Sequence, residues 1–299
     1  MPAGAFPDGP RGIVDPSCHP CHTPAPVRRV LPLLAVLAVV VVGAGCASGS
    51  GASAGSFEPR RPGTLVIATA FLPSAGFWEG SADAPEGGFE WALGEALADR
   101  FGLEDVEVVP VAFPALVGGD LGGADLALSQ LTPTAGREEV LDFSTPYLSA
   151  PPAVVVAPGT EARDAFDLRA LQWVTVEGST LTEVVDDQIR PRDRPERVDG
   201  RAAALERIDT GAAEAMLLDL PVALALEQAQ PDDYSVIAQL GEDEGLAAAL
   251  PPGSDNTVAV DSAIRAFLAD GTIDDLSREW LGAELADGAA DLPLIRLRP

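Results

Sequence analysis

One arginine in the middle of the chain is placed to bind a small carboxylate. The segment Asp125 to Tyr147 reads DLALSQLTPTAGREEVLDFSTPY, and its apolar residues up to Leu128 predict the end of a buried strand. Thr134 is a favourable N-cap, so Arg137 is expected in the first turn of a following helix. A guanidinium there offers two parallel donors beside the partial positive charge of a helix N-terminus. The alternative is that Arg137 pairs with a neighbouring acid on a solvated helix face.

Two other segments place polar groups where a ligand could bind. Asp219 ends an apolar run, and a carboxylate at the carboxyl end of a parallel strand commonly faces a cleft. Its alternative role is to cap the helix that follows. Gly178, Ser179 and Thr180 follow another predicted strand at the start of a helix, where backbone amides and hydroxyls can bind an anion. Most turns of this kind, however, only cap a helix.

Composition removes most catalytic chemistries from the part of the chain after Cys46. That part contains no cysteine and no histidine, and the whole chain contains no lysine. Disulfides, thiol nucleophiles, imidazole bases, Schiff bases and ordinary transition-metal sites are therefore not expected. We expect no metal and no cofactor, and arginine is the only strong side-chain cation.

The chain is strongly acidic, with a net charge of −27. Three of the 19 basic and two of the 46 acidic residues precede Cys46, so the part from Cys46 onward carries about −28. Nucleic acid is therefore not an expected partner. The acidity could attract cationic solutes, but we favour a solvated acidic surface adapted to a salty or high-GC bacterial setting.

The N-terminal region resembles a secretory signal of the lipoprotein kind. Arg28 and Arg29 precede an apolar run from Leu31 to Val42, and three small residues then lead to Cys46. The run is shorter than the roughly 20 residues that span a bilayer. We expect cleavage before Cys46 and lipid attachment to it, although Gly43 stands where leucine is commonest in this signal. An uncleaved membrane anchor is the alternative.

A formal haem-attachment pattern, Cys18-His19-Pro20-Cys21-His22, lies before this signal. We do not expect it to bind haem, because it lies on the cytoplasmic side and its surroundings, rich in proline and glycine, offer no core. Translation starting near Val27 would leave a compact signal. A peptide from the precursor that covers Cys18 would contradict that start.

The remainder predicts a tether followed by α/β structure. Residues 47–62, ASGSGASAGSFEPRRP, cannot bury enough apolar surface to fold. A first βαβαβ cycle and a second group of strands then predict two mostly parallel sheets with crossover helices. The first cycle comprises strands at Thr64–Thr69, Val106–Val111 and up to Leu128, with helices over residues 89–101 and Pro114–Leu121. The second comprises strands at Ala153–Val156, Trp173–Glu177, Ala215–Leu218 and Tyr234–Ala238.

Three further segments complete this reading. Residues Arg190–Gly200, dense in arginine, aspartate and proline, are expected to form an exposed insertion. After Gly245 the chain is expected to return to the first lobe. There one apolar stripe, Val260, Ile264, Phe267 and Leu268, ends at Gly271. Thr272 then caps a second, Ile273, Leu276, Trp280 and Leu281.

Thr134-Ala135-Gly136-Arg137 and Phe143-Ser144-Thr145-Pro146-Tyr147 resemble the signature of the family 3 extracytoplasmic solute-binding proteins, the amino-acid receptors of ABC importers. The closing section around Asp270-Gly271-Thr272 and Trp280 to Gly282 is similar to that family's C-terminal pattern. The resemblance extends over nearly all of residues 63–282.

The resemblance implies a two-lobed fold of the periplasmic-binding-protein type II class. Each lobe would be a mostly parallel sheet flanked by helices, joined by a two-strand hinge near Leu148–Pro152 and Leu240–Gly245. The implied organisation is an extension and lipoprotein signal in residues 1–46 and a tether in 47–62. Lobe 1 would comprise 63–149 with 245–285, lobe 2 would comprise 150–244, and 286–299 would form a C-terminal tail.

The resemblance also implies roles for individual residues. Arg137, Thr132 and the amides of Gly178, Ser179 and Thr180 would hold a ligand carboxylate, and Asp219 would hold its ammonium group. Phe113 matches an aromatic residue that covers the ligand, and Gln130 replaces a glycine whose carbonyl is normally used. Ala70 and Phe71 stand where an acid often appears after the first strand, and Ala92 replaces an aspartate that is usual in the first helix, which leaves the side-chain specificity open. Phe77 and Trp78 could form an apolar wall or belong to the core.

The function implied is that of a monomeric, non-enzymatic receptor of an ABC importer, which closes on an amino acid or related zwitterion. It would be lipid-anchored outside the cell membrane and would meet a permease and an ATPase. Three alternatives stay open. One is an enzyme on the same fold, such as a cyclic amino-acid dehydratase or a lytic transglycosylase, using Glu90, Glu177 or Glu183. The others are a ligand-sensing module of a membrane receptor, and a stand-alone scavenger or surface interaction protein without an importer.

Overall fold

A computed structural model describes residues 56–241, 245–282 and 292–297 of the chain, all within one compact unit, Ser50–Pro299. The expected signal, Cys46 and residues 47–55 of the expected tether lie outside the described residues. The described end of that tether is folded, which corrects the prediction. Phe57 stacks on Phe101 with ring centroids 4.3 Å apart, and the backbone N of Arg60 donates to Asp125 at 2.7 Å.

The sheet of lobe 1 has the order β4-β1-β5-β13-β6. The strands β4, β1 and β5 are parallel, and only β13 runs against its neighbours. Continuous apolar sequence explains β1, and both β1 and β5 are buried on both faces. Their bounds are β1 Thr64–Thr69, β4 Asp105–Pro110, β5 Leu126–Leu131, β6 Asp142–Phe143 and β13 Gly245–Leu250.

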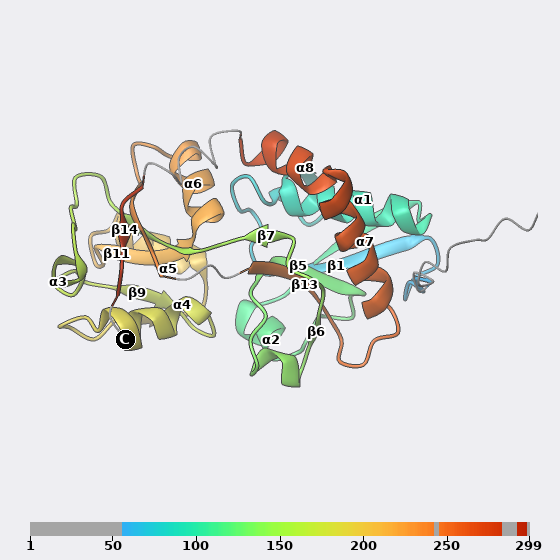
Figure 1. Ribbon diagram of the computed structural model, residues 1–299, viewed down its shortest axis with the longest axis horizontal. Helices are drawn as coiled ribbons and strands as arrows, with labels where there is room; N and C mark the ends of the chain where they lie inside the picture. The colour runs from blue at the N-terminus through green and yellow to red at the C-terminus, as the bar shows by residue number, and fades with distance from the viewer. Residues whose placement is uncertain (1–55, 242–244, 283–291, 298–299) are drawn as a thin grey trace, which may run out of the picture. The chain divides into compact units, whose positions relative to one another are not determined.

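Helices cover both faces of this sheet, as Figure 1 shows. Leu65 and Ile67 of β1 pack with α1 (Phe89–Phe101) and α7 (Thr257–Asp270), whereas Val66 and Ala68 pack with α2 (Phe113–Val117). The period-two alternation of side chains along a strand produces this division. A third helix, α8 (Thr272–Trp280), packs against α1 and α7.

The predicted helices agree with these elements, with small differences. Gly102 ends α1 in the left-handed conformation with φ 70°. The second helix, α2, ends at Val117, earlier than expected. Leu268 is 41% exposed, so it lies outside the buried stripe of α7 in which we had placed it. Thr272 opens α8 without capping it, because its hydroxyl donates to Asp270.

The sheet of lobe 2 has the order β11-β8-β12-β14, and a bridge between Trp173 and Ala215 adds the pair β9-β10 beside β11. Here only β8 runs against its neighbours. The strands are β8 Pro152–Val156, β9 Val174–Val176, β10 Glu196–Val198, β11 Ala215–Asp219, β12 Ser235–Leu240 and β14 Leu294–Ile295. The helices are α3 Ala165–Leu168, α4 Thr180–Glu183 with a π turn at Val184–Ile189, α5 Arg201–Asp209 and α6 Leu220–Ala229.

Two segments of lobe 2 differ from the prediction. The expected insertion Arg190–Gly200 is mostly exposed but contributes the edge strand β10. Within the expected C-terminal tail, β14 pairs in parallel with β12, so this part of the tail extends the sheet.

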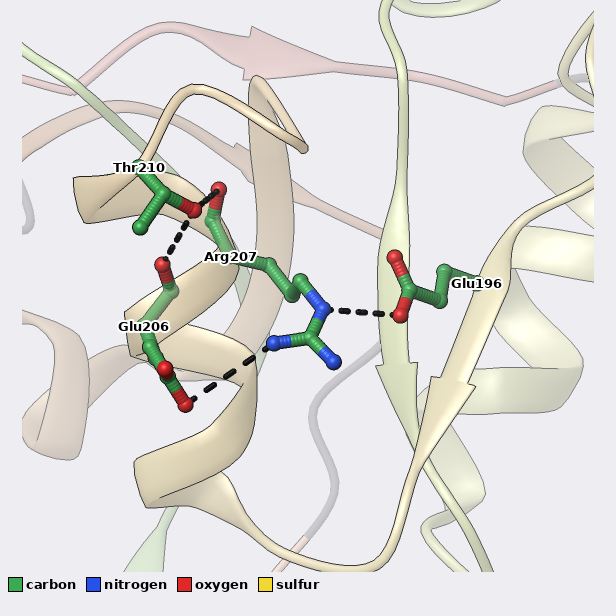
Figure 2. Close-up of polar contacts among 4 residues, drawn as sticks. All are labelled: Glu196, Glu206, Arg207 and Thr210. Carbon is green, nitrogen blue, oxygen red and sulfur yellow. Dashed lines mark hydrogen bonds and ion pairs between the residues drawn. The ribbon is translucent and has the colours of Figure 1, made fainter.

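Surface ion pairs attach α5 to β10 (Figure 2). Nε of Arg207 donates to Glu196 at 2.7 Å, and its Nη1 lies 3.8 Å from Glu206. The hydroxyl of Thr210 donates to the carbonyl oxygen of Glu206 at 2.7 Å, which closes the last turn of α5. These contacts hold the helix that begins with Arg201.

Short elements surround the boundary between the lobes. The strand β7, Leu148–Ser149, pairs with the start of β13 where the two segments expected to form the hinge meet. A hairpin of β2 (Glu79–Ser81) and β3 (Ala84–Gly87) follows β1.

A buried carboxyl group joins α1 to the ends of β5 and β7. Glu90 accepts from Tyr147 Oη at 2.5 Å, from Trp78 Nε1 at 2.6 Å and from the backbone N of Gln130 at 2.7 Å. Its burial raises the pKa of the carboxyl group, and these hydrogen bonds offset part of the rise. Glu90 therefore fixes the backbone at Gln130.

Replacing Glu90 with glutamine is expected to lower the free energy of unfolding by about 1–3 kcal/mol at acid pH, because an amide leaves one of the three donors unpaired. The raised pKa means that the folded state holds more protons than the unfolded state above about pH 4.3, so the contribution of Glu90 falls as pH rises. Urea unfolding between pH 4.5 and pH 8 should show the difference between wild type and Glu90→Gln narrowing with pH. A difference that widens with pH would contradict this assignment.

Candidate functional site

A narrow hollow lies where strands of the two lobes end. Its volume is about 40 Å³, and both lobes line it. The residues that we name from lobe 1 follow β1, begin α2 after β4, or lie at or beyond the end of β5. Those from lobe 2 belong to β9, to α4 and its N-cap, to α5 or to β11. This agrees with the rule that α/β proteins bind ligands beyond the carboxyl ends of their strands. Its polar lining residues are Gln130, Thr132, Arg137, Thr175, Ser179, Thr180, Thr182, Arg201 and Asp219.

Arg137 is buried and spans the two lobes. Its Nη1 donates to the carbonyl oxygen of Thr132 at 2.7 Å, and its Nη2 donates to that of Gly178 at 3.0 Å. The guanidinium carbon lies 5.8 Å from the centre of the Phe113 ring. The structure thus places Arg137 in the hollow rather than on a solvated helix face.

The expected helix around Arg137 is wrong in detail. Arg137 begins a single 3-10 turn, Arg137–Glu139, so no regular helix adds a dipole there. Thr134 still accepts a hydrogen bond from the backbone N of Arg137 at 3.2 Å. The positive charge at this point of the hollow therefore comes from the Arg137 guanidinium and not from a helix dipole.

Asp219 lies on the opposite lobe, at the end of β11. Its side chain is 8% exposed and lines the hollow. It makes no capping hydrogen bond to α6, although it occupies the N-cap position. The alternative role of Asp219 as a side-chain cap is thereby contradicted, and opposite charges from opposite lobes line one hollow.

The turn at Gly178 contributes a carbonyl group and a short helix start. Gly178 has φ 78°, and its carbonyl oxygen accepts from Arg137. Ser179 caps α4, where its hydroxyl accepts from the backbone N of Leu181 at 3.2 Å. Ser179 and Thr180 line the hollow. The Ser179 hydroxyl therefore caps the helix, as the alternative interpretation predicted.

Gln130 has an uncommon backbone conformation for a residue with a side chain. Its φ is 49°, in the left-handed region, and its backbone N is held by Glu90. The glycine that the resemblance implies at this position would adopt this φ without strain. Gln130 and Thr132 are 5% and 7% exposed and line the hollow. Residues in uncommon backbone conformations that the surrounding structure holds in place are common at functional sites.

The aromatic wall of the hollow differs in part from the expected one. Phe113 lines it together with Phe71, and their rings lie 5.0 Å apart. Phe77 lies in the core with its ring 5.8 Å from that of Phe89. Trp78 is also fully buried and donates to Glu90. Phe77 therefore belongs to the core and does not line the hollow, as the alternative interpretation predicted. Trp78 faces a neighbouring space.

That space is a second hollow of about 510 Å³ between the first loop of lobe 1 and helices of lobe 2. Phe71, Arg201 and Leu218 line both hollows. Its other walls are mainly apolar and include Leu72, Trp78, Leu205, Val222 and Leu226.

Arg201 is the charged residue lining this hollow that sequence reasoning missed. It begins α5, immediately after the segment that we had taken as an exposed insertion. Burial lowers the pKa of its guanidinium to about 10, and the charges of Asp219 and Glu90 offset part of that effect. The available signal was an arginine at the start of a helix, in a chain whose only strong side-chain cation is arginine.

Among the described residues, no group of three or more histidine, cysteine, aspartate or glutamate side chains could hold a metal ion. The charged lining of the hollow offers ionic recognition by Arg137, Arg201 and Asp219, with hydroxyl and carbonyl groups around them.

Comparison with known proteins agrees with this architecture. Residues 75–283 match the bacterial extracellular solute-binding proteins, family 3. The chain is 26% identical over 258 residues to the L-cystine-binding protein TcyJ of Escherichia coli (strain K12), with 85% of this chain and 96% of that protein covered. It is 29% identical over 184 residues to the membrane-bound lytic murein transglycosylase F of Idiomarina loihiensis, of which 39% is covered, against 58% of this chain.

A solved structure shares the two-lobed fold. An ancestral arginine-binding protein bound to glutamine superposes with a TM-score of 0.65 at 25% identity, covering 74% of this chain and 99% of that one. The family match extends over more than half of the chain. The chain therefore belongs to the bacterial extracellular solute-binding proteins of family 3.

Proposed function

We propose that the protein binds an amino acid between its lobes and presents it to the permease and ATPase of an ABC importer. The observation that carries the proposal is that Arg137 and Asp219 come from opposite lobes and line one hollow. A zwitterion matches these charges, with its carboxylate at Arg137 and its ammonium group at Asp219. Relatives named for binding cystine and arginine support this class of ligand.

Binding would be coupled to movement of the lobes. Arg137 of lobe 1 reaches the Gly178 carbonyl of lobe 2, and the hollow between them is small, so a solute would enter when the lobes separate. Each charge-assisted hydrogen bond in a dry site contributes about 1.5–3 kcal/mol. Only the closed arrangement makes the contacts of both lobes, so the solute would shift the equilibrium toward it.

A role in binding accounts for the acidic residues better than catalysis does. Glu177 and Glu183 are exposed and do not line the hollow. Glu90 has a raised pKa, but its oxygens accept from Tyr147, Trp78 and Gln130 inside lobe 1. None of these three residues is placed as an acid or base for a molecule in the hollow. We therefore propose a receptor that is not an enzyme.

We also propose that the mature protein is monomeric and lipid-anchored through Cys46 on the outer face of the cell membrane. The short apolar run and small residues before Cys46 support this. No helix in the described part of the chain is long and apolar enough to cross a membrane.

Replacing Arg137 with alanine is expected to weaken amino-acid binding at least about tenfold, because the site loses its carboxylate partner. A thermal-shift screen of the purified chain against the L-amino acids and L-cystine would identify the tightest ligand, and calorimetry would measure its affinity. Arg163→Ala, at an exposed arginine of lobe 2, is the matched control. Unchanged affinity in Arg137→Ala would refute the assigned role.

Replacing Asp219 with asparagine is expected to weaken binding of the tightest amino acid from that screen about tenfold. Binding of the analogue that lacks the α-amino group is expected to weaken less than about threefold. The reason is that only the amino acid carries the ammonium group that Asp219 would neutralise. Calorimetry on both ligands gives the comparison, and a melting curve checks that the variant is folded. Equal losses for the two ligands would remove Asp219 from this role.

Replacing Cys46 with serine is expected to abolish acylation and to leave the residues before position 46 attached. The thiol is the group that would accept the lipid. Intact-mass measurement of both proteins from a bacterial host that processes lipoproteins would test this. The same mature mass in both, apart from the exchanged atom, would rule out lipid attachment at Cys46.

A further inference from the structure

We propose that the site selects an amino acid whose side chain carries a second negative charge, and that Arg201 recognises that charge. The inference rests on the proposed function and goes beyond it by assigning the class of side chain. It follows from the contacts of Arg201, from the balance of charges in the first hollow and from the position of Arg201 between the two hollows.

Arg201 is a lobe 2 residue held by neutral groups of lobe 1. Its Nη1 donates to the Ser74 hydroxyl at 2.9 Å, and its Nη2 donates to Oε1 of Gln130 at 2.5 Å. Its guanidinium carbon lies 4.0 Å from the centre of the Phe71 ring. These contacts orient the guanidinium without neutralising it.

No carboxylate in the described part of the chain forms an ion pair with Arg201, although the charges of Asp219 and Glu90 act on it from farther away. None of the ion pairs found there within 4.0 Å includes Arg201, and its buried Nε has no hydrogen-bond partner. Its pKa of about 10 keeps it cationic at neutral pH. Arg201 is only partly buried, but a cation partly removed from water is still costly unless it is paired, so a ligand anion at this point would be stabilised.

Counting the charges around the first hollow leads to the same class of ligand. Arg137, Arg201 and Asp219 line it, which leaves one excess positive charge. The carboxylate and the ammonium group of a zwitterion would balance the charges of Arg137 and Asp219. The positive charge of Arg201 would then remain unbalanced. A side-chain carboxylate would balance it, whereas the side chain of arginine or lysine would bring a second cation beside it.

The position of Arg201 suits a side-chain group rather than the α-carboxylate. Arg201 lines both hollows, together with Phe71 and Leu218, so it stands between the narrow hollow and the larger one. A side chain that leaves the Arg137 end in this direction would pass Phe71 and reach the guanidinium. The backbone of Gln130 is held by Glu90, and the side chain of Gln130 positions Nη2 of Arg201.

Calorimetry with the purified chain at pH 7.5 tests the inference with matched acids and amides, L-glutamate against L-glutamine and L-aspartate against L-asparagine, together with L-arginine. Wild type is expected to bind one of the acids at least about tenfold more tightly than its amide and than L-arginine. The Arg201→Gln variant is expected to bind that acid about tenfold more weakly than wild type does, and the amide less than about threefold more weakly. Arg201→Lys is expected to retain part of the preference, and Arg163→Gln all of it.

The outcomes separate this inference from the function on which it rests. Equal affinity of wild type for acid and amide, or tighter binding of L-arginine, would overturn the anionic preference and leave amino-acid binding in place. Equal losses of acid and amide in Arg201→Gln would reduce Arg201 to a structural contact between the lobes. If no amino acid in the panel bound or raised the melting temperature, the proposed function would fail as well.

Discussion

The site depends on a buried guanidinium that both lobes hold. Arg137 gives one terminal nitrogen to the carbonyl of Thr132 and the other to that of Gly178, residues that are far apart in the sequence and follow strands of different lobes. A cation shielded from water is tolerated only where oriented oxygen atoms surround it. The two backbone segments must therefore stay where these carbonyls meet the guanidinium.

The topology of each sheet brings those segments together. In each lobe a single strand, β13 or β8, runs against its neighbours, and the other strands share one direction. Gln130 and Asp219 lie at the carboxyl ends of β5 and β11, and the Gly178 turn follows β9. Because Arg137 joins the Gly178 turn to the end of β5, the groups that could recognise a ligand collect where the lobes face each other. The outer strands contribute stability instead.

A second layer of polar contacts supports the site from within lobe 1. Glu90, fully buried on α1, holds the left-handed backbone of Gln130, and Gln130 in turn holds Arg201 of lobe 2. A carboxyl group with a raised pKa is often a sign of catalysis. Here its three donors are parts of the protein itself, which gives it a structural explanation. The same network explains why Trp78 belongs to the core rather than to the wall of the first hollow.

The sequence by itself determined the local elements and the identity of two charged residues of the site. The uninterrupted apolar run of β1 and the helical spacing of α1 predicted both elements, because periodicity is a local property of the chain. Arg137 and Asp219 were recognisable because each follows a buried strand. Only the tertiary structure decided that Arg137 begins a 3-10 turn, that Phe57 packs on Phe101, and that β14 joins β12. It also decided that Arg201 meets Ser74 and Gln130. These contacts join residues far apart in the chain, and their energies depend on packing and burial that no local pattern contains.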